Sequence, residues 1–343
     1  MQRPGRNRNR ISPGNGSTGR RWRVDNAGAW PLLGTVTGEL EKQVLKGVSR
    51  SFYLTLRLLP GPMRGAASLG YLLARTSDTL ADSSGIPVAE RMVALENFAT
   101  AVAGDGMAPH LDPDLVDAIS DERERRLLGC MDQLLEWLRK MPAAEADLVR
   151  EVVAIIISGQ VLDLERFANA DTAHPVALES DAALEDYAWR VAGCVGEFWT
   201  KLGFLTLGDR FSTESPGILL ERGAAYGKGL QLVNILRDVA EDLAAGRCYL
   251  PVSDTGDTRE LLACHRRWVG KAREWTREGE SYARTLHSRR LRAATVLPAL
   301  IARETLEPLG SVMWSELRQR VKVPRSQVYG LVLRAFLSPP PGT

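Results

Sequence analysis

The sequence predicts an all-α protein, a single helical bundle around a central cavity. From about residue 30 onward, apolar residues recur at three- and four-residue steps, the spacing that places them on one face of a helix. Prolines separate these segments, and the alternation typical of β-strands is scarce. The periodic segments are residues 63–82, 88–103, 121–140, 143–168, 181–208, 217–245, 257–287, 290–307 and 325–337.

The two ends of the chain differ from its body. Residues 1–27 hold seven arginines and one acid, Asp25, and few large apolar residues, so we expect a disordered tail. A solvated tail and attraction to anionic lipid headgroups are both open interpretations. We expect one all-α domain over residues 28–337, followed by a short Pro-rich tail over residues 338–343.

The composition excludes several classes of protein. Of the 343 residues, 44% are hydrophobic and 25% are charged, which is ordinary for a globular protein. Beyond the tail there is no basic face interleaved with aromatics, so nucleic acid is not an expected partner. No apolar run approaches the about 18 residues of a membrane span, and the cysteines form no CxxC pair. We expect a cytoplasmic protein and a monomer, with peripheral membrane association left open.

The first acidic motif is Asp78-Thr-Leu-Ala-Asp82, at the end of a predicted helix. Residues four apart share a helix face, so the two carboxylates repel each other by roughly 0.2–0.5 kcal/mol. Mg²⁺ would relieve this repulsion, because it binds oxygen ligands and is usually shared with a substrate phosphate. Arg75, one turn before Asp78, is placed to meet an anionic ligand. For this motif alone, solvated residues at a helix end are the alternative.

A second acidic motif, Asp238-Val-Ala-Glu-Asp242, belongs to a longer polar stripe. Asn234 lies four residues before Asp238, and Gln231 extends the stripe by one step. Inside a bundle such a stripe would leave polar atoms unsatisfied unless a ligand bound them. Two carboxylate pairs facing each other across a cleft would hold a diphosphate through bridging Mg²⁺. Arg247, in the segment that follows, is expected at the rim of the same cleft.

Two further segments suit a ligand of this kind. Ser49, Arg50 and Ser51 combine hydroxyls with an arginine, which are good phosphate donors, although a helix cap is the alternative. Residues 186–199 concentrate four aromatic rings together with two glycines. Aromatic faces stabilise a cation, whereas core packing is the default for any single ring.

Four segments, in this order, resemble the squalene/phytoene synthase family: Ser49–Phe52, Arg75–Asp82, Tyr187–Gly196 and Gln231–Pro251. The similarity covers roughly residues 40–337. The most specific part is Asn-Ile-Leu-Arg-Asp followed by Gly-Arg-Cys-Tyr-Leu-Pro. The first motif, with Asp-Thr-Leu in place of a double Asp, is more similar to the squalene synthases than to the phytoene synthases.

The resemblance implies an α-helical prenyltransferase in which two acidic motifs bind Mg²⁺ ions that hold prenyl diphosphates. The metal ligands would be Asp78, Asp82, Asp238 and Asp242, assisted by Asn234. With the observations above, the candidates for diphosphate binding are Ser49, Arg50, Ser51, Arg75, Gln231, Arg237 and Arg247. The candidates for NADPH binding are Arg50, Arg75, Arg237, Lys322 and Arg325. The cavity candidates are Phe52, Tyr71, Val195 and Phe198.

Three positions depart from the pattern of the animal squalene synthases. Ala81 replaces an acid, so metal binding at the first motif would rest on two carboxylates. Arg190 stands in place of a tyrosine assigned to presqualene formation, and Tyr187, one turn earlier, is the candidate for that catalytic role. Pro324 stands in place of a second NADPH-binding arginine, with Arg325 adjacent.

The implied reaction is the head-to-head condensation of two farnesyl diphosphates to presqualene diphosphate, followed by NADPH-dependent reduction to squalene. A related synthase without the reduction would yield presqualene diphosphate, hydroxysqualene, dehydrosqualene or phytoene. A third hypothesis is a non-enzymatic helical scaffold, similar to family relatives that act as assembly factors for respiratory complexes. Such relatives tend to lose acidic residues, and all four aspartates are present here, so we favour an enzyme of isoprenoid biosynthesis.

Overall fold

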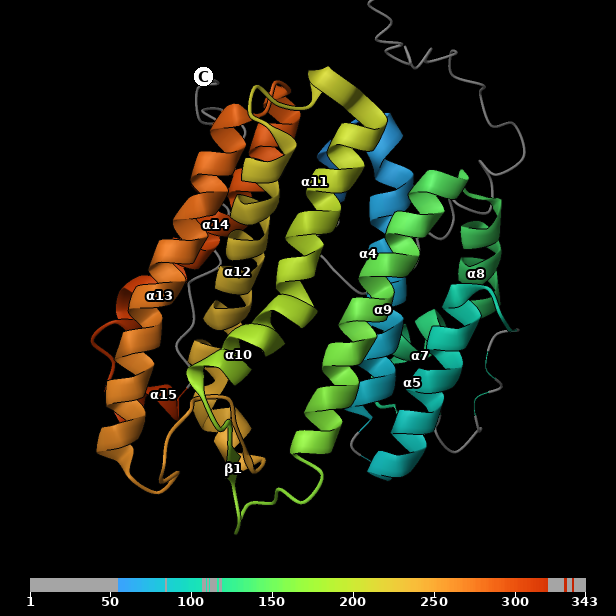
Figure 1. Cartoon of the computed structure of the whole chain (residues 1–343). Helices are drawn as coiled ribbons and strands as arrows, with labels where there is room; N and C mark the ends of the chain where they lie inside the picture. Colours follow the sequence, from blue (N-terminus) through green and yellow to red (C-terminus); the bar gives the residue numbers. More distant parts are fainter. Residues whose placement is uncertain are drawn as a thin grey trace, which may run out of the picture.

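The computed structural model describes residues 55–83, 85–106 and 119–319, together with positions 109, 111, 116, 330, 331 and 335. Over these residues the chain is a bundle of α-helices, and the only strands are one pair of two residues each (Figure 1). The predicted all-α fold is therefore confirmed. The predicted tails, residues 1–27 and 338–343, lie outside the described residues.

Over the described residues the helices follow the predicted segments, with two subdivisions and one short unpredicted helix at Trp314–Leu317; most of the predicted segment 325–337 lies outside the described residues. The segment at 121–140 forms two helices that part at Gly129, and the segment at 181–208 contains a π-helical turn. None of the described helices combines the length and the apolar character that crossing a bilayer requires. The elements are α4 (Gly61–Asp82), α5 (Val88–Ala103), α7 (Glu122–Leu128), α8 (Met131–Lys140), α9 (Ala143–Arg166), β1 (Val176–Ala177), α10 (Asp181–Ala188), the π-helical turn (Trp189–Gly193), α11 (Cys194–Leu207), a 3-10 turn (Gly208–Arg210), α12 (Pro216–Ala244), β2 (Arg247–Cys248), α13 (Thr258–Thr285), α14 (Arg289–Leu309) and α15 (Trp314–Leu317).

Prolines and polar caps set where the helices begin. Pro60, Pro87 and Pro142 directly precede α4, α5 and α9, and Pro216 is the first residue of α12. Proline suits these positions because its φ is already helical and its missing N–H would have no partner there. The caps that accept backbone N–H hydrogen bonds at α10, α13 and α14 are Ser180, Asp257 and Ser288.

Two large apolar cores and a smaller one around α14 hold the bundle together. One large core packs α9 against α4, α5 and α11 around fully buried side chains such as Phe98 and Val153. The other large core packs α12 against α13 around Leu232 and Leu236. Figure 1 shows α4 and α9 on one flank, α12 to α14 on the other, and α11 between them. The contact of α11 with α12 therefore joins the two halves.

The backbones of α11 and α12 touch each other directly. A Cβ atom on Gly196 would lie 1.9 Å from the carbonyl oxygen of Gly223, and one on Gly227 would lie 2.1 Å from that of Ala192. Because both overlaps are with backbone atoms, no side-chain rotation can relieve them. Glycine is therefore needed here for close approach, and the contact fixes α11 and the π-helical turn against α12.

Gly196→Ala should lower the free energy of unfolding by roughly 1–3 kcal/mol, because the new methyl group overlaps a backbone carbonyl. Urea denaturation followed by circular dichroism measures the loss. Gly270→Ala is the matched control, since a Cβ at this exposed position of α13 meets nothing within 4 Å. Its better helix propensity should raise stability by about 0.5–1 kcal/mol. Equal effects of the two changes would contradict the tight contact.

Candidate active site

Three helices bring both acidic motifs to one end of the bundle. α4, α9 and α12 run in the same direction, and their C-terminal ends lie at the lower end in Figure 1. Asp78 and Asp82 occupy the last turns of α4, and Asp238 and Asp242 occupy the last two turns of α12. We call this the carboxylate end.

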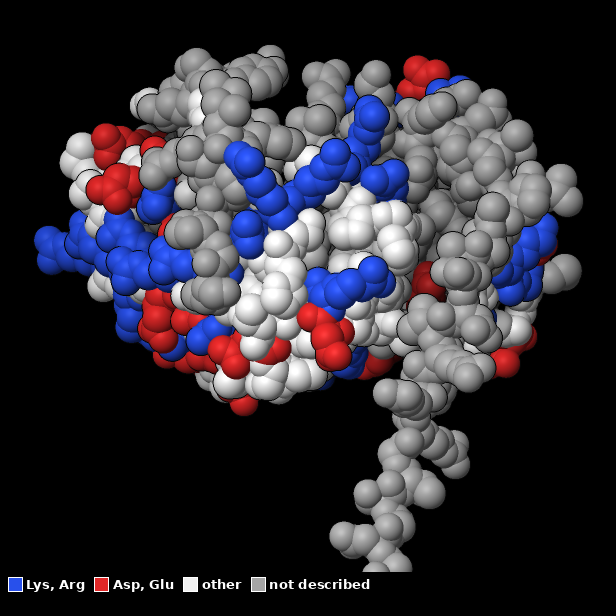
Figure 2. All heavy atoms as spheres, turned by 90° about the horizontal axis from the view of Figure 1, so that it is seen from above, with Lys and Arg blue, Asp and Glu red and all other residues white. Residues whose placement is uncertain are grey.

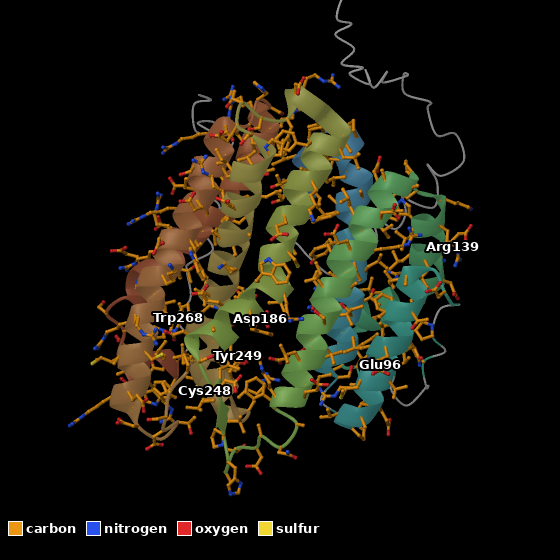
Figure 3. All side chains as sticks on the ribbon, in the orientation of Figure 1. Glu96, Arg139, Asp186, Cys248, Tyr249 and Trp268 are labelled. Atoms are coloured by element: carbon orange, nitrogen blue, oxygen red, sulfur yellow. The ribbon has the colours of Figure 1, made fainter. Side chains whose placement is uncertain are left out.

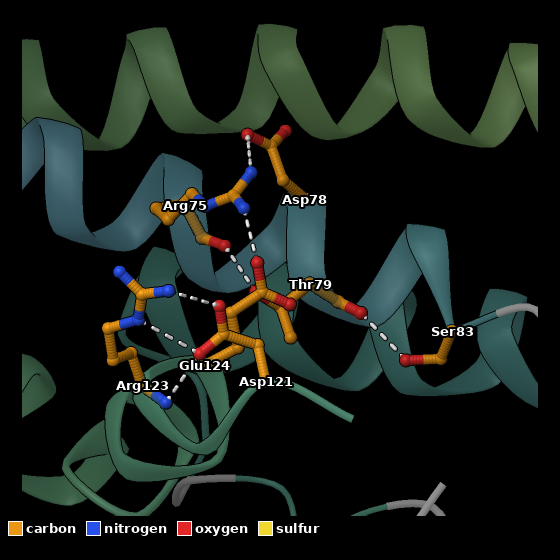
Figure 4. Close-up of polar contacts among 7 residues, drawn as sticks. All are labelled: Arg75, Asp78, Thr79, Ser83, Asp121, Arg123 and Glu124. Carbon is orange, nitrogen blue, oxygen red and sulfur yellow. Dashed lines mark hydrogen bonds and ion pairs between the residues drawn. The ribbon is translucent and has the colours of Figure 1, made fainter. Parts of the chain in front are cut away.

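The carboxylate of Asp78 contacts one residue of α9 and one residue of its own helix, α4. Its Oδ1 accepts a hydrogen bond of 2.6 Å from Gln160 Nε2, and Arg75 Nη1 lies 3.7 Å from its Oδ2. Arg75 also pairs with Glu124 of α7, so its guanidinium lies between two carboxylates (Figure 4). Burial, and then the charge of Asp82, raise the pKa of Asp78 to about 6. Positive charge near this carboxylate is therefore insufficient to hold it fully ionised.

The carboxylates of α12 also have arginine partners. Arg237 Nε donates a hydrogen bond of 2.9 Å to Asp238 Oδ1, and Arg247 Nη2 lies 3.4 Å from Asp242 Oδ1. Burial raises the pKa of Asp242 to about 6, although Arg247 opposes the rise. In the second motif, as in the first, the arginine partners only partly offset the cost of burying a negative charge.

Arg247 connects the two motifs. It pairs with Asp242, and its charge also acts on Asp82 of α4. Burial raises the pKa of Asp82, and Arg75 and then Arg247 oppose this rise. Asp82 and Asp242 are therefore both within the electrostatic reach of one guanidinium. The structure therefore places the two predicted carboxylate pairs at the same end of the bundle.

A small parallel sheet fixes the position of Arg247. β1 pairs with β2, and Val176 N donates a 2.9 Å hydrogen bond to Gly246 O. Gly246 has φ 85°, and a Cβ there would lie 2.7 Å from the backbone of Asp171. Only glycine fits this turn, which redirects the chain from α12 into β2 and returns Arg247 toward the carboxylates.

α9 contributes two site residues that the sequence prediction lacks, Gln160 and Asp163. Asp163 Oδ2 accepts a hydrogen bond of 3.0 Å from Tyr249 OH. Burial raises the pKa of Asp163 to about 6, and the charges of Asp242 and Asp82 add to the rise. A fifth carboxylate therefore lies near both motifs. A signal was present, because Gln160 and Asp163 are polar residues one turn apart in a largely apolar segment.

Tyr187, the predicted catalytic tyrosine, contacts Tyr249, which in turn hydrogen-bonds to Asp163 of the site. The two rings stack with centroids 5.0 Å apart and planes at 19°. Figure 3 shows Tyr249 in the lower part of the bundle, close to α10 in this view. Burial raises the pKa of the Tyr187 phenol well above its usual value, and the nearby carboxylates, Asp163 first, add to this. The Tyr187 phenol is therefore neutral and can donate a hydrogen bond.

Arg190 ties the π-helical turn to α10 and α9. Its Nε donates a hydrogen bond of 2.8 Å to Asp186 Oδ2, and its Nη1 donates one of 2.9 Å to Ser158 Oγ. A Cβ on Gly159 would lie 2.9 Å from Arg190 Cβ, so α9 passes closely here. π-helical turns often occur at functional sites because the extra residue redirects neighbouring side chains. Arg190 is thus engaged in holding two helices together.

A partly open apolar cavity of about 190 Å³ lies between α11, α12, α13 and α14. Val195, one of the predicted cavity residues, lines it together with Trp199, Tyr226 and Leu230. Phe198 is instead buried in the core, where a Cβ on Gly70 would lie 3.5 Å from its ring. The cavity suits an apolar chain rather than a polar ligand.

The remaining predicted residues fall into two groups. Tyr71 is partly buried against the core around α9, Gln231 is partly exposed on α12, and Asn234 is exposed. The residues that lie outside the described part of the chain are Ser49, Arg50, Ser51, Phe52, Lys322 and Arg325.

The carboxylate end fits a divalent cation that is shared with a phosphate. Among the described residues, no three His, Cys, Asp or Glu side chains already form a metal-binding group. Two buried oxygens, Asp163 Oδ1 and Gln160 Oε1, also lack a hydrogen-bond partner there. Mg²⁺ is usually bound by one or two carboxylates, with waters and substrate phosphate completing its shell. Paired carboxylates with unsatisfied oxygens nearby suit such an ion.

Carboxylate pairs and arginines at one end of a helical bundle, together with an apolar interior, define a helical protein suited to a diphosphate joined to an apolar chain. The squalene/phytoene synthase family model matches residues 45–327. The chain belongs to this family.

Several characterised proteins are similar in sequence. A presqualene diphosphate synthase of Rhodopseudomonas palustris is 32% identical over 221 residues, which cover 63% of this chain and 64% of that protein. A bifunctional lycopene cyclase/phytoene synthase of Phaeosphaeria nodorum is 30% identical over 212 residues, 61% of this chain and 33% of that protein. The chain thus spans about a third of the length of the second relative and about two thirds of that of the first.

Solved structures are similar in fold. The complex of TcSQS with the ligand BPH1237 matches with a TM-score of 0.71 and 21% identity, over 88% of this chain and 86% of that chain. The squalene synthase HpnC from Alicyclobacillus acidocaldarius matches with a TM-score of 0.56 and 19% identity, over 88% of this chain and 97% of that chain. At these identities the likeness establishes the fold alone.

Asp242→Asn should stabilise the metal-free protein near neutral pH. Burial raises the pKa of Asp242 from 3.8 to about 6, so the folded state favours the neutral acid, which asparagine resembles. The stability that the neutral acid provides is complete below about pH 4 and is lost as the pH rises through about 6. We expect the variant to gain roughly 1–3 kcal/mol at pH 7 and nothing near pH 4. Urea denaturation in EDTA across this range measures the difference.

Asp181→Asn on α10 is the matched control, because hydrogen bonds from Arg267 lower the pKa of this exposed carboxylate. Its removal should give no gain at pH 7. A gain for Asp242→Asn that did not change with pH, or a loss at pH 7, would show that burial of the charge is not the cause.

Proposed function

We propose that the protein is a Mg²⁺-dependent prenyltransferase that condenses two farnesyl diphosphates head to head to presqualene diphosphate and reduces this with NADPH to squalene. The observation that carries the proposal is the meeting of two carboxylate pairs at one end of a bundle that also contains an apolar cavity. Membership of the squalene/phytoene synthase family supports it.

The metal ions would be held by Asp78 and Asp82 on one side and by Asp238 and Asp242, with Asn234, on the other. When bound, Mg²⁺ supplies positive charge that stabilises a departing diphosphate. The raised pKa values of Asp78 and Asp242 support this assignment, because they show negative charge that the protein alone compensates incompletely.

Three arginines of the carboxylate end would contact the diphosphate oxygens: Arg75, Arg237 and Arg247. Each now pairs with a carboxylate of the site. A guanidinium forms two parallel hydrogen bonds to phosphate as readily as to carboxylate, so these groups can transfer to an arriving diphosphate. Arg75 and Arg237 are also candidates for the NADPH phosphates, together with Arg50, Lys322 and Arg325.

In the condensation, one farnesyl diphosphate would lose its diphosphate and leave an allylic cation. The double bond of the second chain attacks this cation, and loss of a proton closes a cyclopropane, which gives presqualene diphosphate. The stacked rings of Tyr187 and Tyr249 present aromatic surface near the carboxylates, which suits a cationic intermediate. The apolar cavity would hold the prenyl chains and exclude water from the cation.

In the second half-reaction, presqualene diphosphate would lose its remaining diphosphate, the skeleton would rearrange, and hydride from NADPH would quench the cation to give squalene. A synthase that stops at presqualene diphosphate is the second candidate. The observation that favours it is the 32% identity with a presqualene diphosphate synthase.

Incubation with farnesyl diphosphate and Mg²⁺, followed by mass spectrometry of the products, tests the proposal. We expect presqualene diphosphate without NADPH and squalene with it. Squalene formed equally without NADPH would refute the reductive step, and presqualene diphosphate under both conditions would support the second candidate. Absence of any condensed product would overturn the proposal as a whole.

Asp78→Asn and Asp238→Asn should each lower kcat/KM by roughly 10²–10³-fold, because each removes a charge that would hold the diphosphate through metal. Asp147→Asn is the control, since this aspartate lies on α9 with its side chain 74% exposed. It should keep normal turnover. Condensation that persisted in both site variants would leave the carboxylate end without the proposed role.

A further inference from the structure

The end of the bundle opposite the carboxylates carries many arginines. α11 and α13 end here and α12 and α14 begin here, and the two connecting loops are joined by hydrogen bonds from Thr213 N to Thr285 O (2.9 Å) and from His287 N to Phe211 O (3.1 Å). Figure 2, a view onto this end, shows Lys and Arg side chains around uncharged surface. We define the basic end by Arg57, Arg64, Arg210, Arg284, Arg289, Arg290 and Arg292.

Helix stability does not explain these charges. Arg289 and Arg290 lie in the first turn of α14, which contains no acidic residue. Cations at a helix N-terminus interact unfavourably with the helix dipole. Arg210, Arg284 and Arg290 are exposed, and none of the three forms an ion pair with another described residue. Three carboxylates lie nearby: Glu214 is engaged by Arg222 at 3.8 Å, Glu280 is engaged by Arg303 at 3.2 Å, and exposed Asp209 adjoins Arg210. At the basic end, Arg210, Arg284 and Arg290 therefore present positive charge to solvent.

Two large apolar side chains are exposed beside these arginines. Leu205, in the last turn of α11, is 46% exposed, and Ile218, in the first turn of α12, is 42% exposed. Exposed aliphatic side chains among arginines are typical of surfaces that lie in the headgroup region of a bilayer. The apolar groups enter the interface, and the cations meet lipid phosphates.

We propose that the basic end docks on a membrane surface that contains anionic lipid. Arg210, Arg284 and Arg290 would contact headgroup phosphates, and Leu205 and Ile218 would enter the interface. This docking would leave the carboxylate end facing water. It would also turn one wall of the apolar cavity toward the lipid, because Thr55 and Tyr282, which line the cavity, lie near the basic end. The docking surface does not depend on the proposed reaction. A role for docking in releasing an apolar product into the lipid does rest on the proposed function.

Co-sedimentation of the full chain with vesicles of phosphatidylcholine, with and without phosphatidylglycerol, tests the docking. We expect binding only with the anionic lipid, and weaker binding as salt increases. The triple variant Arg210→Glu, Arg284→Glu, Arg290→Glu should lose roughly ten- to hundredfold in partitioning. Leu205→Ser with Ile218→Ser should weaken binding while all charges are kept.

Arg126→Glu, Arg259→Glu, Arg266→Glu is the matched control, because these exposed arginines lie away from the basic end and the net charge changes equally. It should bind as the wild type does. Equal binding of the two triple variants would overturn the proposal and point to another surface, such as the Arg-rich residues 1–27. Binding to nucleic acid but not to vesicles would also overturn it.

Two further measurements separate docking from folding and from catalysis. Both triple variants should melt at the same temperature, which shows that charge reversal has not unfolded either of them. The Leu205→Ser, Ile218→Ser variant tests vesicle binding without any change of charge. Condensation of farnesyl diphosphate in detergent should be unchanged in the Arg210, Arg284, Arg290 variant. Loss of vesicle binding with full turnover in this variant supports the docking surface. If the wild-type protein itself forms no condensed product, only the proposed reaction is contradicted, and the vesicle test still stands.

Discussion

The crowding of carboxylates at one end of the bundle is the constraint on which the rest of the structure depends. Asp78, Asp163 and Asp242 come from three different helices, and the pKa of each is raised to about 6. Burial is the first cause in every case, so the fold holds these groups where their charged forms are least favourable. Such an arrangement opposes folding and is typical of sites that await a cation.

Close helix packing makes this crowding possible. Gly196 and Gly227 let α11 and the π-helical turn touch the backbone of α12, and Gly246 lets the chain turn sharply after α12. The first contact unites the two large apolar cores, and the second returns Arg247 to the carboxylates. The unfavourable burial of charge at the site is thus offset by close packing elsewhere in the bundle.

The sequence predicted most of the helices and both acidic motifs, because both depend on local spacing. Apolar periodicity and the prolines at positions 60, 87, 142 and 216 reflect helix geometry directly. It did not predict Asp163 or Tyr249 as site residues. The spacing of Gln160 and Asp163 indicates a polar face, but what that face meets is decided where α9 contacts the segment after α12. The π-helical turn, the two-residue strands and the exposure of Asn234 depend likewise on tertiary packing.

The arginine partners explain how the protein can fold before any cation arrives. Arg75 lies 3.7 Å from Asp78, and Arg247 lies 3.4 Å from Asp242, which are long contacts that compensate charge without locking the carboxylates. An arriving diphosphate with its cations would bring ligands for both partners at once, since the arginines can bond phosphate oxygens and the carboxylates can bind the metal. Each carboxylate and each arginine of the site would then have an oppositely charged partner, without any movement of the protein backbone. If the proposed function holds, a site built in this way would bind the complex of metal and diphosphate more readily than either component alone.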